Sequence, residues 1–283
     1  MKLAVITDNT TDVPPELVDN SDLYILDIPI IIGDQTFYEG KNIDLDEFYQ
    51  KMAASTELPK TSQPSLSALD DLLSELPAKG YTHVIGLFLA GGISGFWQNI
   101  QFLVDEHPDL NIAFPDSKIA SVPVGLMLRN VLEWNAAGYS FEEVIERLQI
   151  QIDGTSAFVL VDDLNHLVKG GRLSNGSAIL GNLLSIKPIL YFNDEGKIVV
   201  YEKVRTEKKA LKRLVELLND QNDKADYEFS IIHADGEEKA NLLKDMLIES
   251  GLPDKFTEAK FSAVVGTHLG SNAVALGFTP IMK

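Results

Sequence analysis

Apolar runs and amphipathic stretches alternate along the first half of the chain. Runs rich in β-branched and aliphatic residues are typical of buried strands, and they occur at Leu3–Thr7, Leu23–Ile32, His83–Leu89 and Asn111–Phe114. Apolar residues recur every three or four positions elsewhere, which predicts helices at Leu45–Ala54, Ser67–Leu76, Gly95–His107, Val124–Ala137 and Phe141–Gln151. Strands alternating with helices favour an α/β domain with a mostly parallel sheet.

A second unit is expected from about Gln151 onwards. Its predicted strands are Ala157–Val161, Ile186–Phe192, Ile198–Lys203, Glu228–Ala234 and Phe256–Val265, and its predicted helices are Lys208–Asn219 and Glu237–Glu249. The segment 193–196 (Asn-Asp-Glu-Gly) suits a hairpin loop between two of these strands. No low-complexity linker separates the halves. We therefore expect two packed α/β domains, residues 1–152 and 153–283, with a ligand bound between them.

The charge and composition of the chain argue against several classes of binding partner and of chemistry. Of 283 residues, 42 are acidic and 24 basic, so the net charge is −18. This charge argues against nucleic acid and anionic membranes, whose phosphates are bound through Lys and Arg. There is no cysteine, hence no disulfide and no thiolate chemistry, and the histidines show no metal-ligand spacing. Without a signal peptide or an apolar run of about 20 residues, we expect a cytoplasmic protein with no metal and no stable membrane insertion.

The loop that follows the run at Val84–Leu89 predicts an anion site. There the strand pattern breaks into Ala-Gly-Gly-Ile-Ser-Gly (residues 90–95), and helix-forming residues follow at once. The first N–H groups of a helix have no intrahelical partner and favour anions. Ser94 stands where an N-cap is expected and adds a hydroxyl group. Glycines that serve only close packing of helix on strand are the competing interpretation.

Three other loops concentrate polar groups. Pro59–Ser65 carries hydroxyls and an amide ahead of a helix that Ser65 is expected to cap. Two glycines at 170 and 171 let a helix end in a left-handed turn and redirect Arg172, which suits a carboxylate or phosphate. A surface turn with a solvated arginine is the competing interpretation, and this loop alone favours it. His268 lies between glycines after an apolar stretch, where it can bind an anion or act as acid or base. A histidine whose hydrogen bonds serve the structure alone is the more common case.

The 90–95 loop contains neither of two common nucleotide-binding motifs, but an enzymatic function remains an alternative. The loop has no G-x-G-x-x-G pattern and no G-K-[ST] sequence. It narrowly misses the G-x-S-x-G elbow of serine hydrolases, because Phe96 stands where the last glycine belongs. A hydrolase with Ser94 as nucleophile and His268 as base is therefore an open hypothesis, although no aspartate can be assigned as the third partner.

Taken together, the polar loops resemble the DegV family along nearly the whole chain. The ordered segments are 7–10 (TDNT), 61–65 (TSQPS), 93–95 (ISG), 116–118 (DSK), 169–174 (KGGRLS), 187–190 (KPIL), 203–206 (KVRT) and 266–270 (GTHLG). Each piece is weak alone, whereas eight pieces in this order are specific.

The resemblance implies a two-domain α/β protein that binds one long-chain fatty acid between its domains. It also implies that the protein is no enzyme itself and needs no cofactor. Members of the fatty-acid-kinase type are carrier subunits: they present the carboxylate to a separate ATP-dependent kinase, which makes acyl phosphate for phospholipid synthesis. Carried over by position, the ligand-binding residues would be Thr61, Ser62, Ser94, Gly95, Arg172 and His268, with none of them catalytic.

The chain departs from the family pattern in the 90–98 loop. The family usually has Ser-Ser-Gly-Leu-Ser-Gly-Thr-Tyr-Gln there, so that Ala90 and Gly91 replace two serines and Phe96 replaces a threonine. Pro123 also replaces an expected glycine. Each lost hydrogen bond to a charged head group is worth about 1.5–3 kcal/mol. A second alternative is therefore a degenerate family member that binds another small anion and whose apolar tunnel is blocked or empty.

Overall fold

The N-terminal half is built on a four-stranded parallel sheet. The computed structural model describes residues 1–176, 186–223 and 225–282. The sheet order is β2-β1-β6-β7, from Leu23–Leu26, Leu3–Asp8, His83–Gly86 and Asn111–Ala113. All six residues of β1 are buried, as the apolar run predicts for a central parallel strand. The carboxyl ends of β1 and β6 therefore meet at the same edge, where ligands bind in such sheets.

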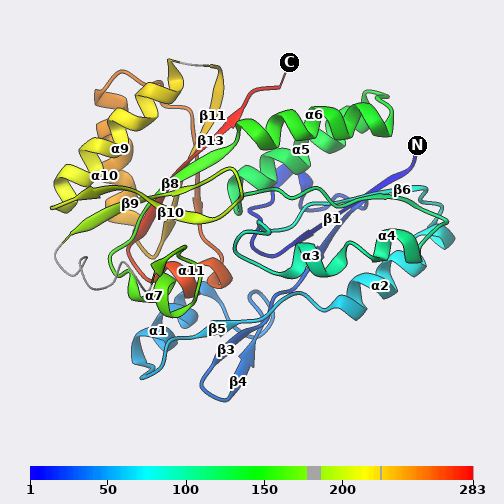
Figure 1. Cartoon of the computed structure of the whole chain (residues 1–283), viewed down its shortest axis with the longest axis horizontal. Coiled ribbons are helices and arrows are strands. Elements are labelled where there is room, and N and C mark those ends of the chain that lie inside the picture. Colours follow the sequence, from blue (N-terminus) through cyan, green and yellow to red (C-terminus); the bar gives the residue numbers. More distant parts are fainter. Residues whose placement is uncertain (177–185, 224, 283) are drawn as a thin grey trace.

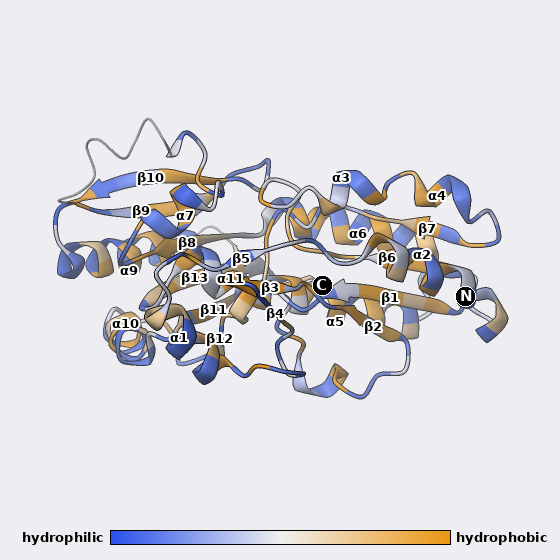
Figure 2. Ribbon diagram, turned by 90° about the horizontal axis from the view of Figure 1, so that it is seen from below, coloured by the Kyte–Doolittle hydropathy of each residue, from blue (hydrophilic) through white to orange (hydrophobic). Residues whose placement is uncertain are grey.

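The C-terminal half is built on a mixed six-stranded sheet. Its order is β10-β9-β8-β13-β11-β12, from Ile198–Val204, Lys187–Phe192, Ser156–Leu160, Ala273–Pro280, Tyr227–Ala234 and Phe256–Lys260. Only β11 and β12 pair in parallel; the other neighbours are antiparallel. Helices α9 (Glu207–Asn222) and α10 (Glu237–Glu249) bury apolar residues against this sheet. In Figure 2 most strands carry hydrophobic colours and the outer helices carry both.

Two helices join the sheets. Helix α5 (Val122–Ala136) contacts β1 of the first sheet and both β11 and β13 of the second, and α6 (Phe141–Gly154) packs on α5 and β13. Arg129 on α5 forms hydrogen-bonded ion pairs with Glu228 on β11, at 2.5 and 3.1 Å. Figure 1 shows both helices above β1, with β13 at their left end. One apolar core continues through the two halves here, in agreement with the predicted packed α/β architecture.

Residues 30–61 of the N-terminal half leave the first sheet and pack against α11 (Ala263–Leu269). They contain the small antiparallel sheet β4-β3-β5 (Gln35–Phe37, Ile30–Ile32 and Lys60–Thr61) and α1 (Leu45–Ala54). Glu39 accepts a hydrogen bond from the first N–H of α11, 2.7 Å away. A Cβ at Gly266 would lie 2.5 Å from the Tyr49 hydroxyl, so α1 packs closely on this helix. The lower part of Figure 1 shows these elements together.

Several predicted boundaries were wrong, each for a local reason. The strand predicted at Leu23–Ile32 is two strands in different sheets, because Pro29 has no N–H for a ladder. The helix predicted at Gly95–His107 is two, α3 (Phe96–Ile100) and α4 (Leu103–Glu106). There the Gln101 side chain takes the Trp97 carbonyl that the helix ladder would use. The strand predicted at Phe256–Val265 ends at Lys260, because Ser262 caps α11.

The remaining described helices are α2 (Leu66–Glu75), α7 (Asn165–Lys169) and the two 3₁₀ turns Pro15–Leu17 and Pro77–Lys79. Helix α2 begins after Ser65, whose hydroxyl accepts from the Ala68 N–H at 3.2 Å, so the predicted cap is confirmed. Asp44 caps α1 in the same way, through the Glu47 N–H at 2.8 Å. Local capping signals were therefore sufficient to place these two helix starts.

Candidate functional site

An apolar pocket lies between the two halves of the chain. We call it the inner pocket; a cleft between two packed domains is a common place for a ligand. Both halves line it, with Ile28, Ile119 and Pro123 from one side and Ala157, Ile232 and Ala275 among those from the other. Most of its lining side chains are aliphatic or aromatic. A long apolar molecule therefore suits its interior.

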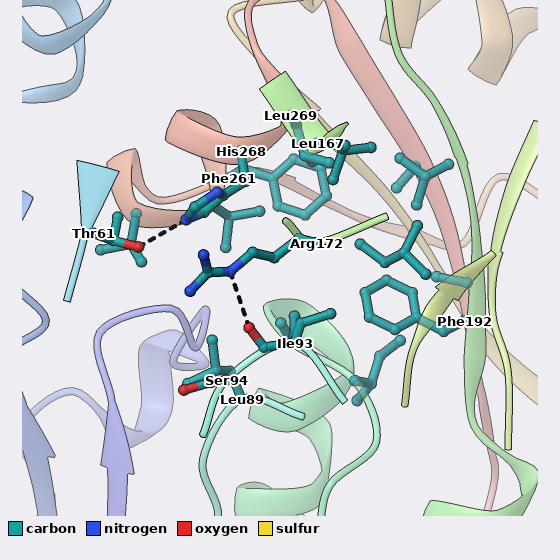
Figure 3. A pocket seen from close by; sticks show the side chains of 18 of the residues that line it. Thr61, Leu89, Ile93, Ser94, Leu167, Arg172, Phe192, Phe261, His268 and Leu269 are labelled. Carbon is teal, nitrogen blue, oxygen red and sulfur yellow. Dashed lines mark hydrogen bonds between the residues drawn. The ribbon is translucent and has the colours of Figure 1, made fainter. Parts of the chain in front are cut away.

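Polar side chains gather at one end of the inner pocket. Five of the six predicted site residues line it there: Thr61, Ser62, Ser94, Arg172 and His268. Figure 3 shows Thr61, His268, Arg172 and Ser94 near one another, and Phe192 at the opposite, apolar side. The pocket is therefore amphipathic, with hydrogen-bonding groups at one end only.

Asp8 anchors the loop at this end rather than lining the pocket. Its carboxylate accepts hydrogen bonds from the Leu89 N–H (2.8 Å) and from the Thr10 N–H (2.9 Å) and hydroxyl. Complete burial raises the pKa of Asp8, while these hydrogen bonds act in the opposite direction. Asp8 at the end of β1 therefore joins this strand to the loop that follows β6.

Ser94 lies in the loop but is not the N-cap that the pattern predicts. The N-cap of α3 is Gly95, and the Ser94 hydroxyl oxygen accepts a hydrogen bond from the Phe96 N–H at 3.3 Å. Because that hydroxyl still has its own proton, Ser94 can donate to an anion in the inner pocket. Gly95 is exposed and does not line the inner pocket. Of the six predicted residues, it is the one that the structure places outside the lining.

Thr61 and His268 are joined by a hydrogen bond. Thr61 is on β5 and His268 near the end of α11, and the Thr61 hydroxyl lies 2.7 Å from His268 Nε2. Burial lowers the pKa of His268 to about 4, and the positive charge of Arg172 acts in the same direction. The ring is therefore neutral at physiological pH.

Arg172 is oriented by the turn that its preceding glycines predict. Gly171 has φ +73°, and the Arg172 and Gly171 N–H groups donate to the carbonyls of Leu167 and Val168, as in a Schellman motif. The Arg172 side chain then crosses to the other half, where Nε donates to the Ile93 carbonyl at 3.2 Å. This hydrogen bond holds the Arg172 guanidinium at the polar end of the inner pocket.

The three departures from the family pattern in the 90–98 loop lie behind the inner pocket, not in it. Phe96 is buried edge-to-face on Phe88, with ring centroids 5.0 Å apart. A Cβ at Gly91 would lie 2.9 Å from side-chain atoms of Asp116 and Trp97, so a serine does not fit there without rearrangement. Neither Ala90, Gly91 nor Phe96 lines the inner pocket. The alternative of a degenerate family member therefore gains no support from the side chains of this loop.

Pro123 does line the inner pocket, at the first turn of α5. Proline suits this position because its missing N–H has no helical acceptor there. Helix α5 accordingly starts at Val122, two residues earlier than the apolar period suggests.

The pairing that a serine hydrolase requires is absent from the described part of the chain. Ser94 bonds to Phe96, whereas His268 bonds to Thr61, and no hydrogen bond joins Ser94 to His268. A catalytic serine needs its hydroxyl within hydrogen-bond reach of the base. Within residues 1–176, 186–223 and 225–282, no group of three or more acidic or histidine side chains could hold a metal ion. In the same residues, no helix combines the length and the apolar character needed to cross a bilayer.

Much of the apolar lining was not predicted. Ala275 belongs to β13, a strand inside the second sheet that was not among the predicted strands. The run AVALGF at 273–278 carried the signal, since such runs are typical of strands buried on both faces. Residues from α11 and the segment before β3 were also missed, because their approach depends on tertiary packing.

Comparison with known proteins agrees with this geometry. A family model described as "Uncharacterised protein, DegV family" matches residues 2–280. A DegV domain-containing protein of Streptococcus pyogenes serotype M3 is 64% identical over 280 residues, covering 99% of both chains. One from Streptococcus pneumoniae is 53% identical over the full length of both.

Solved structures give the same result. The crystal structure of a fatty acid binding DegV family protein from Streptococcus agalactiae superposes with a TM-score of 0.98, at 57% identity and 99% coverage of both chains. That of DegV, a fatty acid binding protein from Bacillus subtilis, superposes with a TM-score of 0.88, at 33% identity, covering 99% of this chain and all of that one.

Proposed function

The chain belongs to the DegV family, and from this premise we propose that it binds one long-chain fatty acid in the inner pocket. The observation that carries the proposal is the amphipathic pocket itself, apolar along its length and polar at one end. The relatives from S. agalactiae and B. subtilis, described as fatty acid binding proteins, support it. Burying each CH₂ of an acyl chain contributes about 0.8 kcal/mol, so a chain of 16 or 18 carbons supplies ample affinity.

In the proposed complex the carboxylate lies among Ser94, Arg172, Thr61 and His268. Ser94 donates its hydroxyl proton, and Arg172 supplies the positive charge from a side chain already held by the Ile93 carbonyl. Neutral His268 and Thr61 share one hydrogen bond; when His268 Nε2–H donates it, the Thr61 hydroxyl proton is free to turn toward the ligand. Ser62 lines the same end, and the Gly95 N–H is proposed as a backbone donor at its margin.

We further propose that the protein acts as a carrier without turnover of its own. In this role it presents the carboxylate to a separate ATP-dependent fatty acid kinase in the cytoplasm, for acyl phosphate and phospholipid synthesis. The proposal extends the DegV resemblance to its fatty-acid-kinase type. It requires the polar end of the pocket to be reachable from outside, and Arg172 and His268 also line a second, more open hollow there.

Extraction of the purified protein under denaturing conditions, followed by lipid mass spectrometry, tests the binding proposal. We expect one fatty acid per chain, or uptake of one equivalent of added palmitate or oleate. A protein that is empty and accepts neither would overturn it. Transfer of ³²P from labelled ATP to the bound fatty acid by a purified fatty acid kinase tests the carrier role. Loaded protein that is never phosphorylated would remove the kinase part and leave binding intact.

A further inference from the structure

A second hollow opens on the outer side of the polar end. We call it the outer pocket; its empty volume, open to solvent, is about 1,170 Å³. It shares Thr61, Arg172 and His268 with the inner pocket, so these three side chains form the boundary between the two. The rest of its lining comes from residues 56–60, from α7 and Gly170, and from Thr267. A group attached to the head of a ligand in the inner pocket would therefore enter this hollow.

The outer pocket is cationic in an acidic protein. Lys60, Lys169 and Arg172 line it, against the single carboxylate of Glu57. Within the described residues, neither Lys60 nor Lys169 forms an ion pair, and both side-chain bonds of Arg172 go to backbone carbonyls, those of Ile93 and Gly170.

Elsewhere in the described chain some cations pair with carboxylates, whereas others, such as Lys208 and Lys260, are unpaired but line neither the inner nor the outer pocket. Lys118 with Asp153, Lys187 with Asp162 and Arg213 with Glu202 are examples of the pairs, at 2.8, 3.1 and 2.9 Å. Cations that stay unpaired and converge on one hollow, in a chain of net charge −18, indicate a site for an anion.

We propose that the outer pocket is a phosphate subsite, which holds the phosphoryl group of an acyl phosphate whose chain lies in the inner pocket. This inference rests on the proposed function. In that reaction a carboxylate oxygen of the fatty acid attacks the γ-phosphorus of ATP on the kinase. The new O–P bond forms, the bond to the β-phosphate oxygen breaks, and ADP leaves with that electron pair.

The position of the polar end determines the direction in which an added phosphoryl group would extend. Thr61, His268 and Arg172 close the polar end of the inner pocket, so an added phosphoryl group extends outward, past them, toward Lys60 and Lys169. The acyl phosphate carries more negative charge than the carboxylate, and two unpaired ammonium groups match that increase. The two lysines thus distinguish product from substrate, since the carboxylate alone does not extend into the outer pocket.

The test compares two ligands on the full-length protein stripped of lipid. One is palmitate. The other is 2-oxoheptadecylphosphonate, the stable analogue of palmitoyl phosphate in which CH₂ replaces the bridging oxygen. Dissociation constants are measured by displacement of a fluorescent fatty acid for the wild type, Lys60→Gln, Lys169→Gln and the double variant. Lys208→Gln, at an exposed position of α9, is the matched control for loss of one positive charge.

We expect each single variant to bind the analogue roughly threefold to tenfold more weakly, and the double variant more weakly again. Palmitate affinity should change less than twofold in all of them, and Lys208→Gln should match the wild type. Equal loss for both ligands, or no loss for the analogue, would overturn the phosphate subsite while leaving fatty acid binding in place. A wild-type protein that binds neither ligand would overturn the proposed function itself.

Discussion

Protonation of His268 is expected to lower the free energy of unfolding as the pH falls from about 6.5 to 4. In the folded protein, burial lowers the pKa of His268 to about 4, whereas a histidine in an unfolded chain titrates near 6.5. Between these values the unfolded chain binds a proton that the folded chain does not. The contribution to stability is therefore complete above about pH 6.5 and is lost as the pH falls toward 4. The difference of about 2.5 pKa units corresponds to at most about 3.4 kcal/mol.

Urea unfolding of the wild type and of His268→Gln at pH 4, 5, 6 and 7 isolates this contribution. Glutamine does not titrate, and its amide can still bond to the Thr61 hydroxyl. We expect the difference in unfolding free energy between the two proteins to change steadily from pH 6.5 to 4 and to stay constant above. An identical pH dependence in both, with an NMR titration of the His268 ring centred near 6.5, would refute the reasoning.

The pKa of His268 is also expected to change when a fatty acid binds. A carboxylate beside His268 favours the imidazolium, so bound palmitate should raise the pKa of His268. Linkage then requires palmitate to bind more tightly as the ring becomes protonated. The measurement is the NMR titration repeated with palmitate. A midpoint that does not move would mean that the carboxylate lies away from this ring.

Three further predictions concern the loop at the end of β6. Ser94→Ala should weaken palmitate binding roughly tenfold to hundredfold, because it removes one hydrogen bond to a charged group; Ser67→Ala on exposed α2 is the control, and equal affinities would remove Ser94 from the site. Gly92→Ala should lower the unfolding free energy by about 1–3 kcal/mol, since its Cβ would lie 2.4 Å from backbone atoms of the 193–196 turn. Gly95→Ala, whose Cβ meets nothing nearer than 3.8 Å, should be close to neutral, and similar urea midpoints for these two variants would contradict the packing argument. Asp8→Asn should cost about 1–3 kcal/mol in urea unfolding, because an amide N–H would face a backbone N–H; unchanged stability would contradict that role.

Local features of the site could be predicted because neighbouring residues determine them. Gly170 and Gly171 end α7 and redirect Arg172 through hydrogen bonds that span only a few residues. Ser65 caps its helix for the same reason. The parallel order of strands around β1 follows from the alternation of apolar runs and helices, and with it the position of the polar loops at one sheet edge.

Boundaries inside apolar stretches were less predictable. The pattern alone does not show that Gln101 competes for a helix carbonyl, or that Gly95 rather than Ser94 is the N-cap of α3. These outcomes depend on side-chain hydrogen bonds that the periodicity of apolar residues does not contain. The division into residues 1–152 and 153–283 stays a prediction.

The sequence by itself determined the family, the α/β class and which loops carry the polar groups. Tertiary structure alone decided how those groups meet: Thr61 bonds to His268 across 207 positions of the chain, and Arg172 reaches Ile93 across 79. It also decided that Ala90, Gly91 and Phe96 pack behind the pocket and that Lys60 and Lys169 face one hollow. The physical reason is the separation along the sequence of the residues that make each contact. Caps, turns and hydrophobic periods arise from contacts a few residues apart, whereas a pocket forms where distant segments bury their apolar faces together.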